Sequence, residues 1–198
     1  MKVVPIKRTD AIPAENILLQ LQRVQHAHDE LAHRDILSFN LHKRLKHMVL
    51  HFYKYAGKIE TSRLANDKIA MRATLLDAFI ICMASANAMN LSLEKTLPAS
   101  AEAQDLDGLA KVLGRKFNGH DLFGNAVSRF VVIGGKMAKA LESEDHMEVG
   151  NPRAEMNGLL PEMTETVLGL LGHLGTGLDT DIRQRLISVE KKSIFSQD

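Results

Sequence analysis

Apolar residues recur at three- and four-residue spacing along most of the chain, which is the pattern of amphipathic α-helices. Strand-type alternation does not persist over any length, so the pattern predicts an all-α protein. The first 13 residues contain two prolines and no helical stripe, and we expect an extended arm or short strand there. The expected helices span about residues 14–33, 35–61, 65–89, 106–117, 122–142, 153–174 and 179–195, with a short closing helix before residue 98.

One stretch of the sequence occurs twice in related form. Residues 54–60 read Lys-Tyr-Ala-Gly-Lys-Ile-Glu, and residues 133–139 read Ile-Gly-Gly-Lys-Met-Ala-Lys. Each Gly-Lys lies in the second half of a long expected helix and precedes a helix rich in Leu, Ala and Met. The similarity between these two stretches predicts a tandem duplication. Its expected parts are an arm at 1–13, a first repeat at 14–98 and a second at 99–198, with both repeats packed as one unit.

Charge is distributed unevenly along a chain whose formal net charge is only +1. Residues 42–63 contain six Lys or Arg and a single acid, Glu60, whereas residues 142–165 contain seven acids and a single base, Arg153. The basic segment falls on the polar face of the helix expected at 35–61. Such a face is either simply solvated or binds a polyanion, and Phe52, Tyr53 and Tyr55 beside it favour a nucleic acid whose bases stack.

Other kinds of chemistry have little support in the sequence. The single cysteine, Cys82, lies among apolar residues and is expected to be a buried, inert thiol. Zinc-type Cys/His spacing, Gly-rich phosphate loops and Gly-x-Ser-x-Gly are missing. His47 and His51 stand at i, i+4, but without a cysteine or a well-placed acid we expect no metal and no cofactor. The lack of a long apolar run predicts a cytoplasmic protein that does not contact a membrane.

The paired Gly-centred helices, each followed by an apolar helix that ends in a turn such as Asn-Leu-Ser-Leu-Glu, resemble the MazG-like all-α NTP pyrophosphatases. The resemblance covers roughly residues 35–97 and 120–188. In that family one helix carries Glu-Glu-x-x-Glu around a glycine and the next carries Glu-x-x-Asp, and these carboxylates hold magnesium against a triphosphate. The resemblance implies a helical bundle that forms oligomers.

The chain departs from that family at almost every carboxylate. The matching positions are Lys54, Tyr55, Lys58, Thr74 and Asp77 in the first repeat and Val132, Ile133, Lys136, Pro161 and Thr164 in the second. Only Asp77 is acidic, and we expect it to be capped or ion-paired rather than a catalytic base. Magnesium requires hard anionic oxygen ligands, whereas lysine attracts phosphate directly. We therefore expect a fold that was retained and a catalytic activity that was lost.

This combination is similar to a small family of podovirus proteins, single-stranded-DNA-binding cofactors of a viral RNA polymerase. The similarity implies a non-catalytic transcription cofactor that binds single-stranded DNA, forms a homo-oligomer and acts in the host cytoplasm beside that polymerase. The residues expected to bind nucleic acid are Lys43, Arg44, Lys46, His47, Lys54, Tyr55, Lys58, Arg63 and Lys136.

Two other hypotheses remain open on the sequence. The chain could be a divergent magnesium-dependent nucleotide pyrophosphohydrolase that uses Asp77, Glu60 and either Glu162 or Glu165. It could also be a scaffold that only pairs with another protein.

Overall fold

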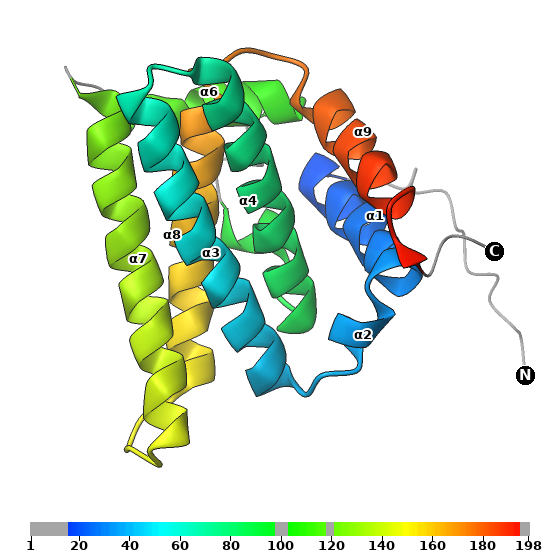
Figure 1. Ribbon diagram of the computed structural model, residues 1–198, viewed down its shortest axis with the longest axis vertical. Coiled ribbons are helices and arrows are strands. Elements are labelled where there is room, and N and C mark those ends of the chain that lie inside the picture. The colour runs from blue at the N-terminus through cyan, green and yellow to red at the C-terminus, as the bar shows by residue number, and fades with distance from the viewer. Residues whose placement is uncertain (1–15, 98–102, 118–120, 195–198) are drawn as a thin grey trace, which may run out of the picture.

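The computed structural model describes residues 16–97, 103–117 and 121–194, which form helices joined by turns (Figure 1). No strand occurs within these ranges, and the all-α prediction is confirmed. The arm expected at residues 1–13 lies outside the described residues.

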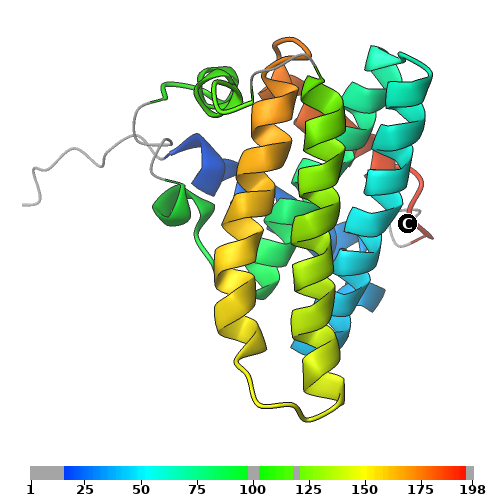
Figure 2. The same cartoon turned by 90° about the vertical axis from the view of Figure 1, so that its left-hand side faces the viewer.

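Within the described residues, four helices of 20 to 24 residues form a central bundle. They are α3 (Leu41–Leu64), α4 (Lys68–Ala88), α7 (Leu122–Asp145) and α8 (Pro152–Leu171). The helices α3 and α4 form one hairpin and α7 and α8 form another, and α3 packs on α7 while α4 packs on α8 (Figures 1 and 2). The rings of Phe52 and Phe130 meet edge to face at the α3–α7 contact, with 6.0 Å between centroids. Two hairpins of nearly equal length thus share one core.

Shorter helices cover the bundle on two sides. On the α4 side, α1 (Ile17–Ala32) and α9 (Leu178–Glu190) pack on α4 and on each other (Figure 1). On the α8 side, α6 (Leu106–Gly114) packs on α8. Two single-turn helices, α2 (Arg34–Leu37) and α5 (Leu93–Thr96), lie in the connections. The last helix of the described chain is therefore a neighbour of the first.

Each long helix of the bundle begins at an Asn or Asp whose side chain accepts a hydrogen bond from a backbone N–H in the first turn, which satisfies a donor with no partner inside the helix. These N-cap residues are Asn40, Asp67, Asp121 and Asn151. The prediction of one continuous helix over residues 35–61 was wrong because Asn40 starts a new helix after the α2 turn.

The helix α4 is almost wholly apolar and lies at the centre of the fold. Cys82 on this helix is fully buried, which confirms the predicted buried thiol, and burial raises the pKa of its thiol to about 12. Ile69 is apolar but 85 % exposed, because it lies in the first turn of α4, beyond the packed part of the helix. Among the described helices α4 alone has the length and apolarity of a membrane span, but 61 % of its apolar window is buried inside the bundle.

Candidate anion-binding pocket

A cavity of about 340 Å³ lies between α3 and α4 of the first hairpin and the covering helices α1, α2 and α9. Two carboxylates and four cationic side chains line it, so its formal charge is +2 when the histidines are neutral. The lining charged residues are Asp29, Arg44, Lys54, Lys58, Asp77 and Arg185. Three of these residues, Lys54, Lys58 and Asp77, occupy positions where the resemblance described above would place magnesium-binding carboxylates.

Lys54 and Lys58 stand one helical turn apart on α3 and reach the cavity from the same wall. The Lys54 ammonium lies 2.9 Å from Nδ1 of His51 and 4.7 Å from the ring centroid of Tyr55. Partial burial, followed by the charge of Lys58, lowers the pKa of Lys54. Neither ammonium group has a carboxylate of the described residues within ion-pair distance. The two charges are therefore available to an anion.

Three uncharged side chains of α3, those of His47, His51 and Tyr55, also line the cavity. Nε2 of His47 lies 3.2 Å from Nε2 of His51, and Nδ1 of His51 lies 3.3 Å from the hydroxyl of Tyr55. Burial is the main reason that the pKa of His51 falls to about 4, and it also lowers the pKa of His47. Tyr55 is only 5 % exposed, so its ring contributes to the cavity wall and is not free to stack on a base.

Asp77 faces the cavity from α4, and its carboxylate is bound by Arg185 of α9. The guanidinium donates through Nε to Oδ1 at 2.6 Å and through a second nitrogen to Oδ2 at 2.9 Å. This two-bond geometry is the strong form of an arginine–carboxylate pair. Asp77 therefore has the ion-paired role that we expected, and its charge is already neutralised by Arg185.

The remaining predicted residues of α3 are used elsewhere in the fold. Arg44 reaches the cavity, but it also donates to the carbonyls of Leu37 and Phe39 and so fixes the α2–α3 turn. The Lys43 ammonium lies 3.8 Å above the centre of the Phe39 ring. Lys46 forms an ion pair with Asp145.

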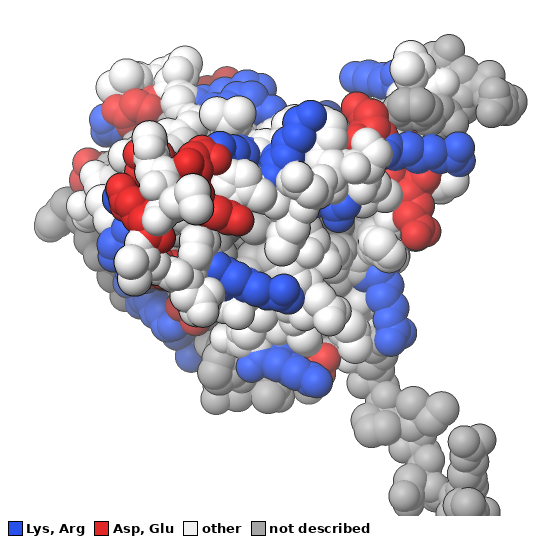
Figure 3. Space-filling model, turned by 90° about the horizontal axis from the view of Figure 1, so that it is seen from below, with Lys and Arg blue, Asp and Glu red and all other residues white. Residues whose placement is uncertain are grey.

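Acidic side chains gather at the end of the molecule where α7 turns into α8 (Figure 3). His42 contacts Glu144 at 2.7 Å and Asp145 at 2.9 Å, so the start of α3 is held against this acidic end. The basic and acidic segments that are separated along the sequence thus partly neutralise each other in space.

Two further candidates lie away from the cavity. Arg63, in the last turn of α3, binds Glu60 with distances of 2.7 and 2.8 Å, and Lys136 is exposed on α7. The structure therefore gathers Arg44, His47, Lys54, Tyr55 and Lys58 at one cavity and places Lys43, Lys46, Arg63 and Lys136 outside it.

The acids of the enzyme hypothesis are dispersed and paired. Glu60 binds Arg63, Glu162 lies 3.4 Å from Arg129, and Glu165 lies 2.9 Å from Lys116, in addition to the pair between Asp77 and Arg185. None of these acids belongs to a potential metal-binding group within the described residues.

Sequence reasoning missed two parts of the cavity wall. Arg185 carried no local signal, because its partner Asp77 is 108 positions away. His28, Asp29 and His33, near the end of α1, were not among the expected site residues. Burial raises the pKa of Asp29, and a hydrogen bond with Gln25 opposes that change.

Comparisons with protein-family models, with curated proteins and with solved structures found no match to this chain.

Proposed function

We propose that this protein is a non-catalytic single-stranded-DNA-binding protein that holds backbone phosphate groups at Lys54 and Lys58. The observation that carries the proposal is the pair of ammonium groups on one wall of a cavity, without carboxylate partners, beside an acid that Arg185 already neutralises. Lysine binds phosphate as a compact positive charge, and both lysines are exposed, so an incoming strand can reach them.

Recognition in this proposal depends on phosphate more than on bases. Tyr55 is buried, and the more accessible Tyr53, at 41 % exposure, lies against Gly134 and Gly135 of α7 rather than in the cavity. Phosphate contacts carry no sequence information and weaken as salt rises. We therefore expect binding that tolerates any base sequence and is strongly salt-dependent.

The proposal includes the duplicated MazG-like architecture. The two long hairpins have closely matched lengths, and each is covered by a helix that precedes it in sequence, α1 on α4 and α6 on α8. This correspondence supports the duplication that the two similar Gly-Lys stretches predict. In the same proposal the ancestral metal position has become the cationic wall at Lys54 and Lys58.

The proposed biological setting is transcription by a viral RNA polymerase in the host cytoplasm, with the protein acting as a homo-oligomer. Apolar side chains exposed on the adjoining helices α3 and α7 support self-association, since exposed apolar patches commonly mark interfaces. Leu50, Val131 and Val132 are 68 %, 43 % and 56 % exposed, respectively.

A labelled single-stranded oligonucleotide, titrated with protein at several sodium chloride concentrations, tests this function. We expect saturable binding that weakens steadily with salt and is stronger than binding to the matching duplex. The same preparation, incubated with deoxynucleoside triphosphates and magnesium, is expected to release no pyrophosphate. Folded protein that fails to bind the oligonucleotide even at low salt would refute the proposal, and pyrophosphate release would favour the enzyme hypothesis.

A further inference from the structure

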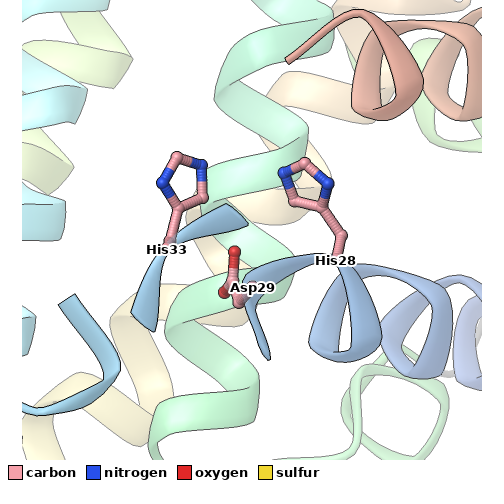
Figure 4. A group of neighbouring side chains, drawn as sticks. All are labelled: His28, Asp29 and His33. Carbon is pink, nitrogen blue, oxygen red and sulfur yellow. The ribbon is translucent and has the colours of Figure 1, made fainter. Parts of the chain in front are cut away.

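At the α1 side of the same cavity, two imidazoles and a carboxylate converge. Each of His28, Asp29 and His33 offers one potential ligand atom, and these three atoms lie within 4.8 Å of one another. Figure 4 shows the Asp29 carboxylate between the two rings, and each ring turns one nitrogen toward the other. The ring centroids are 5.3 Å apart. This is the only such group of three within the described residues.

The end of α1 brings these side chains together. His28 and Asp29 lie in its last turns, and His33 is the residue that follows it, with φ −135° and ψ 40° outside the helical region. Asp29 and His33 are four residues apart, a spacing that brings side chains to one face of a helix, whereas a continued helix would turn His33 about 140° away from His28. The backbone N–H of His33 still donates to the carbonyl of Asp29 at 2.9 Å, which fixes the position of the turn.

A carboxylate from α9 orients the most buried of the three residues. Oε1 of Glu190 lies 2.8 Å from Nδ1 of His28, whose side chain is 3 % exposed. That contact occupies Nδ1 and leaves Nε2 as the nitrogen free to coordinate. Metal-binding histidines in proteins commonly have such an outer carboxylate, which fixes the tautomer and makes the coordinating nitrogen more basic.

We propose that His28, Asp29 and His33 form a binding site for a first-row transition-metal ion of the zinc class. Two imidazoles with one carboxylate suit zinc and its neighbours, whereas magnesium and calcium prefer oxygen ligands alone. Asp29 and Glu190 supply two negative charges that balance a divalent ion. Zinc ligands stand about 3.3 Å apart in a tetrahedral site, so small side-chain rotations from the present separation suffice.

The site has three protein ligands and opens onto the cavity. Structural zinc sites usually have four protein ligands, whereas three leave a position for water or an exogenous group. The ion would face the cavity that also contains Lys54 and Lys58. The proposal does not depend on DNA binding, because the three ligands and Glu190 lie on and after α1 and on α9.

Titration of the metal-free full-length protein with zinc chloride, in competition with a chromophoric chelator, tests the site. We expect one zinc ion per chain, no saturable binding of magnesium at comparable concentrations, and loss of zinc binding in both Asp29→Asn and His33→Gln. Glu190→Gln retains all three ligands and is expected to weaken affinity by about 10- to 100-fold. These substitutions are conservative, and circular dichroism establishes that each variant is folded.

Two controls separate this site from other histidines. His146→Gln removes an exposed histidine at the end of α7 and is expected to leave zinc affinity unchanged. His47→Gln removes one member of the neighbouring i, i+4 pair on α3 and is expected to leave the one-to-one site in place. Absence of saturable zinc binding by the wild-type chain overturns the proposal. It is also overturned if folded Asp29→Asn and His33→Gln bind zinc normally, or if binding is lost only with His47→Gln.

Discussion

Replacing Arg185 with methionine removes the guanidinium that holds Asp77 and retains most of the apolar stem. Asp77 is 19 % exposed and Arg185 43 % exposed, so the pair is intermediate between a surface and a buried ion pair. Hydrogen bonds to charged groups contribute about 1.5 to 3 kcal/mol when buried, and exposure of the arginine reduces this to about 1 to 2 kcal/mol for the pair. We expect Arg185→Met to lower the free energy of unfolding by that amount. Urea denaturation should show a midpoint lower by about 0.3 to 0.7 M for an m value near 3 kcal/mol/M.

Arg183 on the same helix provides a matched control. Both of its contacts with Asp179 are 3.0 Å long, but they lie within α9 and both side chains are about 40 % exposed. Arg183→Met is therefore expected to cost only about 0.3 to 0.5 kcal/mol. In a double-mutant cycle with Asp77→Asn, Arg185→Met should show a coupling energy of about 1 to 2 kcal/mol. Equal, small effects of the two arginine substitutions would refute the inference that Arg185 locks Asp77.

Three further predictions concern packing, pH and reactivity. Gly172→Ala, at the C-cap of α8, would place a methyl group 2.4 Å from the carbonyl oxygen of Ala110, and we expect urea denaturation to show a loss of about 1 to 3 kcal/mol in the free energy of unfolding. Gly158→Ala, within α8 and with open space around it, should instead stabilise the protein by about 0.5 to 1 kcal/mol. The pKa of His51 is lowered to about 4 in the folded protein, so on acidification the unfolded state takes up a proton first, and stability should fall from about pH 6.5 toward pH 4. His51→Gln should flatten that fall. A pH profile of stability that is the same in the variant would contradict the lowered pKa. Cys82 should react with a thiol reagent only on unfolding, so fast labelling of the native protein would contradict its burial.

Hydrophobic spacing was sufficient to predict the helices, but it concealed one boundary. Leu37, Leu41 and Leu45 keep a four-residue spacing across the break between α2 and α3, so the apolar stripe continues where the backbone does not. The boundary depends on Asn40, whose side chain accepts from the N–H of Lys43 and starts a new helix. An N-cap residue such as Asn40 can be recognised from the local sequence, but the prediction followed the continuous apolar spacing instead.

The candidate site was predictable where its parts share one hairpin. Lys54, Lys58 and Asp77 lie on two consecutive helices, and a resemblance based on spacing was enough to place them together. One pairing that decides which cations are free is local, between Glu60 and Arg63, but another joins distant segments. Lys46 meets Asp145 across 99 positions, and no pattern in the single sequence indicates that contact.

The central claim is that Lys54 and Lys58 hold phosphate groups of a single strand. The most direct measurement compares the salt dependence of oligonucleotide affinity for wild type, for Lys54→Gln with Lys58→Gln, and for Lys46→Gln with Arg63→Gln. Each phosphate contact contributes about 0.7 to the slope of log affinity against log salt, so the first double variant should reduce the slope by about 1.4 and weaken binding at low salt. The second double variant removes the same charge from the same helix, but Asp145 and Glu60 already neutralise those cations, and its slope should stay near that of wild type. An unchanged slope for Lys54→Gln with Lys58→Gln, or an equal loss in both double variants, would contradict the claim.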